Sequence, residues 1–230
     1  MNRNINNISD LFDMLDSKVK LAEFDWMYSD RPQAPFIVQN ELPDENLIEF
    51  IESIDYPKPQ DALELGCGEG RNAIYMARKS INVTAIDISQ VAINNAKRLA
   101  NKHGVNVNFV ADDIFKAKLG SYQFVYDCGC LHHLAPHRRL TYLDLLDKVL
   151  ISGGYLGLSC FAWGKNCADE VDDWEFYNSG FHAGVAFTEG RLRGLFNKRY
   201  DTIYVREYKN GIRDTIQGLE FMLVCLFKKK

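Results

Sequence analysis

Residues 61–87, DALELGCGEGRNAIYMARKSINVTAID, decide the fold of this chain. A short apolar run ends in the glycine turn GCGEG (residues 66–70), a helical pattern follows, and a second apolar run ends at Asp87. Glycines let a backbone bend sharply and approach a ligand without an intervening Cβ, and the free N–H groups at a helix start can bind a carboxylate or phosphate. An acid at the end of the second strand can accept hydrogen bonds from both hydroxyls of a ribose. The stretch therefore predicts a strand, a ligand-binding turn, a helix and a second strand.

The same alternation continues toward the C-terminus. Further strands are expected at residues 105–112, 122–129 and 155–161, with helices after Ser89 and from Pro136 to Leu150. A helix near residues 188–196 then leads into two strands, 201–208 and 219–227, joined without a helix. Strands joined in this way pair antiparallel, whereas strands separated by helices form a parallel sheet. We expect an α/β fold, a Rossmann-like seven-stranded mostly parallel sheet with helices on both faces and a C-terminal antiparallel hairpin.

The first 58 residues have a different pattern and predict a helical cap region on a core formed by residues 59–230. One helix face is predicted from the three- and four-residue spacing of Ile8, Leu11, Phe12, Leu15 and Val19. A second helix follows Pro43-Asp44 and ends at the proline-containing stretch 56–59. No composition shift divides the 230 residues, so one domain is expected.

Composition excludes several classes of protein. Apolar residues make up 47% and charged residues 25% of the chain, which is typical of a globular protein. The formal charge of −4 gives no basic surplus for nucleic acid, which we do not expect as a partner. The six cysteines lie mostly in apolar runs, which favours reduced thiols and a cytoplasmic location. Neither a signal peptide nor a membrane span of roughly 20 apolar residues is expected, and no membrane partner is predicted.

Several motifs in order resemble those of a known family. The spacing G-x-G-x-G is tighter than the G-x-G-x-x-G of dinucleotide enzymes. The series ELGCGEG, AIDIS, FVADDI, a strand ending YDCG, and SGGYLGL resembles that of class I S-adenosylmethionine methyltransferases. Within that family, GCGEGRNAIYMA is similar to the tellurite-resistance and thiopurine methyltransferase-like bacterial group, and LHHLAPHRR looks like a further bacterial group. The similarity is strong over residues 61–161. In the C-terminal strands it is limited to the order of the elements, which end in an antiparallel hairpin.

The resemblance implies an S-adenosylmethionine site that releases S-adenosylhomocysteine after transfer. Its residues would be Glu64, Gly66, Cys67, Gly68, Gly70, Asp87, Ile88, Asp113, Ile114 and Cys128. The glycine turn and Glu64 would lie along the methionine part, and Asp87 would hold the ribose. Ile88 would pack on the adenine, Asp113 would accept from its amino group, and Ile114 would supply a backbone N–H. The backbone around Cys128 would border the methionine arm.

The acceptor is expected at the carboxyl ends of the strands, where ligands bind open α/β sheets. The aromatic segment with Trp26, Tyr28 and Arg31 would cover the site as a lid, or it packs as part of the N-terminal helices. Arg138 and the residue after it lie in the first turn of a predicted helix, where the helix dipole disfavours cations. Arg138 and Arg139 would bind an anionic group of the substrate, or they are solvated surface residues.

His132 and His133 follow the fourth strand and are candidate bases, because imidazole titrates near neutrality. The alternative is that one of them packs in the loop and caps the next helix. Cys128, Cys130 and Cys160 end adjacent strands and, with the histidines, resemble a ligand set. Cys-x-Cys within a strand points its side chains to opposite faces, so no metal site is expected.

The predicted activity is transfer of a methyl group to an O, N or S atom of a small-molecule acceptor by in-line displacement. The sulfonium methyl is already activated, so the protein mainly holds donor and acceptor at roughly 3–3.5 Å. Two alternatives stay open, an NAD-dependent oxidoreductase and a non-catalytic S-adenosylmethionine-binding module. Glycine spacing, Glu64 and the C-terminal hairpin weigh against the first. The chain is expected to be a monomer or a homodimer.

Overall fold

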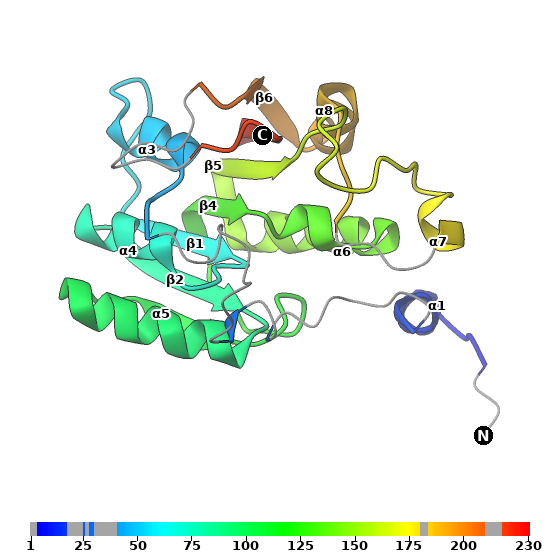
Figure 1. The fold of residues 1–230 in the computed structure, drawn as a ribbon, viewed down its shortest axis with the longest axis horizontal. Helices are drawn as coiled ribbons and strands as arrows, with labels where there is room; N and C mark the ends of the chain where they lie inside the picture. Colours follow the sequence, from blue (N-terminus) through cyan, green and yellow to red (C-terminus); the bar gives the residue numbers. More distant parts are fainter. Residues whose placement is uncertain (1–3, 18–24, 26–27, 30–40, 180–183, 210–217) are drawn as a thin grey trace.

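The computed structural model describes residues 4–17, 25, 28–29, 41–179, 184–209 and 218–230. Seven strands form a single sheet in the order β3-β2-β1-β4-β5-β7-β6 (Figure 1). They are β1 (Asp61–Leu65), β2 (Asn82–Asp87), β3 (Asn108–Ala111), β4 (Tyr122–Cys128), β5 (Leu150–Phe161), β6 (Tyr200–Glu207) and β7 (Met222–Lys229). The first five strands run parallel, and β7 pairs antiparallel with both β5 and β6. The predicted sheet and its terminal hairpin are confirmed.

Helices cover both faces of this sheet. They are α1 (Ile8–Asp16), α3 (Glu45–Glu52), α4 (Arg71–Arg78), α5 (Gln90–His103), the 3-10 helix η1 (Leu131–His133), α6 (Pro136–Val149), α7 (Phe176–Ser179) and α8 (Glu189–Phe196). One core lies between the sheet and α3, α4 and α5, and the other lies between the sheet and α6 and α8. The chain thus builds the two-sided layer arrangement that a parallel sheet needs to bury both faces.

Helix ends follow local rules that the sequence displays. Ser89 Oγ accepts from the backbone N of Ala92 at 3.1 Å and caps α5, and Gly104 ends this helix in the left-handed conformation. Pro136 is the first residue of α6, where its missing N–H costs no hydrogen bond. Two boundaries differ from expectation. The third strand begins at Asn108 instead of residue 105, and β5 begins directly at Leu150, where the helix was expected to end.

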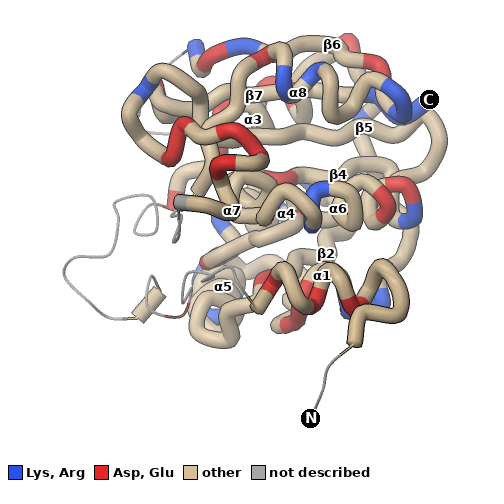
Figure 2. Tube along the Cα trace, turned by 90° about the vertical axis from the view of Figure 1, so that its right-hand side faces the viewer, with Lys and Arg blue, Asp and Glu red and all other residues tan. Residues whose placement is uncertain are grey.

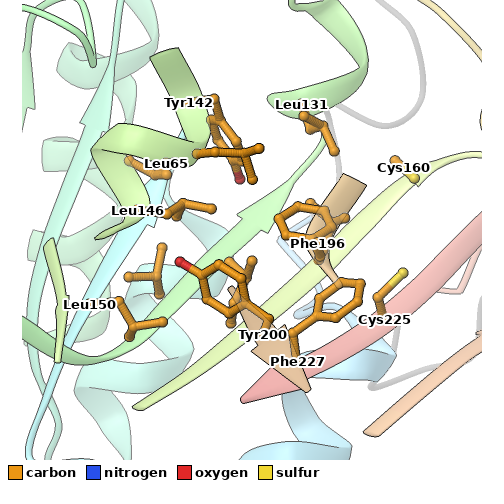
Figure 3. Close-up of a cluster of buried hydrophobic side chains, with 14 of the residues drawn as sticks. Leu65, Leu131, Tyr142, Leu146, Leu150, Cys160, Phe196, Tyr200, Cys225 and Phe227 are labelled. Carbon is orange, nitrogen blue, oxygen red and sulfur yellow. The ribbon is translucent and has the colours of Figure 1, made fainter. Parts of the chain in front are cut away.

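The core on the α6 side joins the hairpin to the parallel strands (Figure 3). The rings of Phe196 and Phe227 stack with centroids 4.5 Å apart, and Tyr200 meets Phe196 edge-on at 5.7 Å. All three side chains are almost fully buried. Aromatic pairs in these geometries add about 0.5–1.5 kcal/mol beyond the burial of their area. The core therefore fixes β6 and β7 against β5 and leaves the carboxyl ends of β1, β2, β4 and β5 together at one edge.

Two segments outside the sheet are rich in acidic residues. Asp10, Asp13 and Asp16 lie on α1, and five Asp or Glu residues fall within residues 169–175, which precede α7 (Figure 2). α1 packs against α6, where the rings of Phe12 and His137 are 5.2 Å apart. No helix in the described part of the chain is long and apolar enough to cross a membrane.

Candidate functional site

The glycine turn follows β1 and is enclosed by side chains from elsewhere in the chain. Gly66 and Gly68 have φ angles of 65° and 52°, in the left-handed region that favours glycine. A Cβ on Gly66 would lie 2.8 Å from the Cβ of Cys130, and a Cβ on Gly68 would lie 2.9 Å from the hydroxyl of Tyr28. Glycine is thus required here by the backbone angle and by the packing of the turn.

Asp87 joins this turn to the start of α5. It is the last residue of β2 and is 6% exposed. Its Oδ2 accepts from Gly68 N at 2.8 Å, and its Oδ1 accepts from Ser89 N at 2.9 Å. Burial raises its pKa despite these bonds. Each carboxylate oxygen can accept a second hydrogen bond, and the contact of Asp87 with ribose hydroxyls stays a prediction. Next to it, Ile88 is 59% exposed at the strand end, available for a flat apolar ligand.

Glu64 lies in β1 directly beneath the turn and is almost fully buried. Asn72 Nδ2 donates to its Oε1 at 3.0 Å, while its Oε2 has no hydrogen-bond partner among the described residues. Burial raises the pKa of this carboxyl to about 8. A buried carboxyl oxygen without a donor is costly, and a cation beside it removes the cost. The α-ammonium of S-adenosylmethionine supplies such a cation, so these residues fit that cofactor.

The turn after β3 contains the residues expected near an adenine. Asp113 Oδ1 accepts from Phe115 N at 2.9 Å, and its Oδ2 is 3.2 Å from Lys116 Nζ. Ile114 is buried. Cys67, in the glycine turn, is also buried, and its backbone N donates to Ile86 O at 3.0 Å. The bonds of Asp113 stabilise its own turn, and its contact with an adenine amino group stays a prediction.

Asp127, in β4, is a buried acid that sequence reasoning missed. Its Oδ1 accepts from Cys130 N at 2.8 Å, and its Oδ2 accepts from Leu131 N at 3.1 Å and from Tyr142 Oη at 2.6 Å. Burial raises its pKa to about 6. These bonds fix the turn through Gly129, whose φ is 108°, and hold Cys130 against the glycine turn. The signal in the sequence is an acid inside an otherwise apolar strand.

Cys128 lies on the opposite side of that turn, in contact with two buried charges. Its Sγ is 3.3 Å from Asp44 Oδ2 and 3.3 Å from Arg71 Nη2. The two phenols of Tyr126 and Tyr208 also donate to Asp44, which is 1% exposed. Sequence reasoning missed this network because Tyr126 and Tyr208 are 82 and 164 residues from Asp44 along the chain.

The cysteines and histidines that resemble a ligand set in the sequence are dispersed in space. Cys160 is fully buried in the core on the α6 side, whereas Cys128 faces α4. Within the described ranges, no group of three or more His, Cys, Asp or Glu side chains is arranged to hold a metal ion.

The two histidines after β4 differ in environment. His132 is 3% exposed and stacks on Phe161, with ring centroids 3.7 Å apart. Its Nδ1 accepts from Phe161 N at 3.2 Å, and its Nε2 is 3.2 Å from His133 Nε2. Burial lowers the pKa of His132 well below its usual value, so the ring is neutral. With Nδ1 accepting, the proton is on Nε2 and points to His133, which leaves the half-buried His133 as the accessible member of the pair.

The predicted lid is described at Tyr28, while Trp26 and Arg31 lie outside the described residues. Asn95 Nδ2 donates to the backbone carbonyl of Tyr28 at 3.2 Å. The hydroxyl of Tyr28 packs against Gly68. The structure therefore places Tyr28 over the cofactor turn, and an acceptor contact by this residue stays a prediction.

Arg138 is held by α1. Its Nε donates to Asp16 Oδ2 at 2.9 Å, its Nη2 bonds the same carboxylate, and its guanidinium lies 5.6 Å from the ring centre of Phe12. A substrate anion at Arg138 would have to displace Asp16.

Comparison with known proteins gives consistent matches. A family model described as a methyltransferase domain matches residues 62–154. An uncharacterised methyltransferase of Schizosaccharomyces pombe is 35% identical over 105 residues, 45% of this chain and 72% of that protein. A similar fold occurs in the 1,6-didemethyltoxoflavin-N1-methyltransferase of Burkholderia thailandensis, solved with 1,6-didemethyltoxoflavin and S-adenosylhomocysteine. The TM-score is 0.68 at 20% identity, covering 100% of this chain and 93% of that one. TehB of Haemophilus influenzae gives a TM-score of 0.58 at 19% identity, covering 80% and 62%.

Proposed function

Because this chain belongs to the class I S-adenosylmethionine-dependent methyltransferases, we propose that it methylates an O, N or S atom of a small-molecule acceptor. The observation that carries the cofactor side is the buried Glu64 carboxyl, whose Oε2 has no partner in the described part of the chain. It lies beneath the glycine turn that Asp87 fixes through Gly68 N. An acid for the ammonium, an acid for the ribose and a bent backbone between them support binding of an adenosyl amino acid.

Bound S-adenosylmethionine supplies a methyl group on a positively charged sulfur. The protein's task is then to bind, orient and exclude water. Glu64 holds the ammonium end, Asp87 holds the ribose, and Tyr28 lies over the turn and shields it from solvent. The Asp127 bonds hold the turn after β4 against Gly66, which keeps the cofactor and acceptor sides in register.

A base is needed when the accepting atom carries a proton. We assign this role to His133 in place of His132, because His132 is almost fully buried; to take a proton at Nε2, His133 gives up its hydrogen bond with His132. When His133 takes a proton, its charge further disfavours protonation of the neighbouring buried His132. The pair therefore holds one positive charge at most.

Three observations support the remaining parts of the proposal. The B. thailandensis enzyme of similar fold was solved with 1,6-didemethyltoxoflavin, which supports a small-molecule acceptor here. The charge of −4 does not favour nucleic acid as substrate. All six cysteines are free thiols, which supports a cytoplasmic location.

Calorimetry with S-adenosylhomocysteine and with NAD tests the cofactor. We expect micromolar binding of the first and no binding of the second, and the opposite result would favour the oxidoreductase alternative. Formation of S-adenosylhomocysteine with a panel of small O, N and S acceptors tests the transfer. Binding without turnover on any acceptor would favour the non-catalytic module.

A further inference from the structure

Arg139 is a buried cation with an open hydrogen-bonding edge. It lies in the first turn of α6, and its side chain is 4% exposed. Its Nη1 bonds Asp173 Oδ1 at 2.5 Å, while Nε and Nη2 have no partner among the described residues. Nε and Nη2 share one edge of the guanidinium, and this edge binds a carboxylate through two parallel hydrogen bonds. This edge of Arg139 therefore has the geometry that matches a carboxylate.

Among the described ion pairs around Arg139, two arginines share the single carboxylate of Asp173. Asp173 also pairs with Arg191, and both guanidiniums lie over the ring of Phe187, at 4.9 Å and 5.1 Å from its centre. Two arginines and one aspartate sum to a charge of plus one. Burial lowers the pKa of Arg139 although Asp173 acts in the opposite direction. A buried charge with incomplete pairing is costly, and a ligand anion would relieve that cost.

This cluster adjoins the acceptor side of the site. Phe187 N donates to Phe161 O at 2.8 Å, and Val185 N donates to His132 O at 2.8 Å. Phe161 in turn stacks on His132, the buried member of the histidine pair. Arg139 is thus connected, through one ring and one backbone segment, to the carboxyl ends of β4 and β5, where ligands of open α/β sheets bind.

We propose that the Nε–Nη2 edge of Arg139 binds a carboxylate of the methyl acceptor. This inference rests on the proposed methyl transfer and deepens it by naming the acceptor class. A single planar monoanion matches one guanidinium edge and neutralises the cluster. A phosphate dianion would leave the cluster negative and would be repelled by Asp173. The N-terminal end of α6 also favours an anion at this position.

Thermal shift of the full chain with saturating S-adenosylhomocysteine tests the proposal, with benzoate and acetate as probes and their amides as neutral isosteres. We expect a saturable rise in Tm with the carboxylates and none with the amides. Arg139→Lys retains the charge without the fork and should raise the half-saturating concentration at least tenfold. Arg193→Gln, on the same helix as Arg191 but paired with Glu189, is the matched control and should leave it unchanged.

Asp173→Asn gives a second, independent readout. It removes a negative charge beside Arg139 and leaves the Nε–Nη2 edge untouched, so carboxylate affinity should rise about tenfold even as basal Tm falls. The proposal is overturned if neither probe gives a saturable shift, if Arg139→Lys responds like the wild type, or if Asp173→Asn weakens binding. Equal response to inorganic phosphate at matched ionic strength would also overturn it, since the site would then take any free anion.

The same samples separate this proposal from the function on which it rests. Loss of the S-adenosylhomocysteine shift contradicts methyl transfer, whereas a retained cofactor shift with no Arg139-dependent carboxylate effect contradicts only the acceptor class. Turnover supports the inference if hydroxy- and aminobenzoates exceed their amides at least tenfold in kcat/KM and Arg139→Lys removes that preference.

Discussion

The proposed cofactor region, residues 61–114, and the proposed acceptor region, residues 126–179 and 184–187, are built in different ways. In the first, Asp87 bonds backbone groups that lie 2 and 19 residues away, at the ends of regular elements. In the second, the decisive contacts join side chains across irregular segments, such as Arg139 with Asp173, 34 residues apart. In the proposed function, cofactor binding therefore depends on local backbone geometry, whereas acceptor recognition depends on tertiary contacts that can change without altering the glycine turn.

Asp127 lies at the junction between the two regions, and its loss should have the largest effect. Asp127→Ala leaves the N–H groups of Cys130 and Leu131 and the hydroxyl of Tyr142 without their buried acceptor. At about 1–3 kcal/mol for each unsatisfied group, partly relieved by water, we expect a loss of about 3–4 kcal/mol in the free energy of unfolding. Chemical denaturation measures it.

Tyr142→Phe is the control for that variant, because it removes a single donor from the same carboxylate. It should cost only about 1 kcal/mol and leave affinity for S-adenosylhomocysteine unchanged. Asp127→Ala, by contrast, should weaken that affinity as well, since the turn that packs Cys130 on Gly66 is released. If Asp127→Ala destabilises the chain and leaves cofactor affinity intact, the two regions are not joined through this turn.

Gly66 and Gly104 separate local geometry from packing within the cofactor region. Both have φ near 65°, but a Cβ at Gly66 would lie 2.8 Å from Cys130 Cβ, whereas nothing lies within 4 Å of one at Gly104. Gly104→Ala should cost about 1 kcal/mol of stability from backbone strain alone and leave cofactor binding unchanged. Gly66→Ala should lower the affinity for S-adenosylhomocysteine about a hundredfold, equivalent to about 2.7 kcal/mol of binding free energy. Calorimetry measures this change. Equal effects at both glycines would show that the turn has no special packing.

The fold could be predicted from the sequence because its determinants are local. Ser89, Gly104 and Pro136 mark helix ends by their own chemistry, and the two periodicities separate strands from helices. Strand boundaries were less accurate, because pairing with neighbours decides them. Val107, for example, follows a strand pattern but precedes β3.

The candidate site could be predicted only in its cofactor half. The turn, Glu64 and Asp87 are spaced along one stretch, so their proximity follows from a strand–turn–helix–strand unit. Asp44 gave no such signal, since Tyr208 reaches it from the loop after β6. Arg138 and Arg139 were predicted together as anion-binding candidates, and the sequence did not indicate that Arg139 is the buried one. Its burial follows from how α6 faces residues 173–191, which no sequence pattern specifies.

Proton release on ligand binding tests the role of Glu64 directly. Its pKa of about 8 keeps it mostly protonated at pH 7, and the ammonium of a bound ligand favours the ionised form. Binding of S-adenosylhomocysteine at pH 7 should therefore release close to one proton, measured by calorimetry in buffers of different ionisation enthalpy. Glu64→Gln should bind about tenfold more weakly and release none through this group. Proton release that is the same in both proteins would contradict the assignment.

The stability of the unliganded protein should change with pH in the matching direction. A raised pKa in the folded state means that the folded protein holds the Glu64 proton more tightly than the unfolded chain does. This contribution is complete below the usual glutamate pKa and is lost as pH rises through about 8. The wild type should thus lose stability relative to Glu64→Gln between pH 6 and pH 9. A constant difference across that range would remove the basis for the proton-release prediction.

The ion pair of Arg138 with Asp16 should have the smallest effect, and it tests whether α1 belongs to the acceptor region. The pair is partly exposed, at 21% and 33% of the two side chains, and solvent screening limits its contribution to at most about 1 kcal/mol. Arg138→Gln and Asp16→Asn should therefore lower Tm slightly, and a double-mutant cycle should give a coupling of about 0.5 kcal/mol. Carboxylate binding in the presence of S-adenosylhomocysteine should stay unchanged, because Arg138 already has its anion. A fall in carboxylate affinity for Arg138→Gln that matches that of Arg139→Lys would instead place both arginines around one ligand and extend the acceptor region to α1.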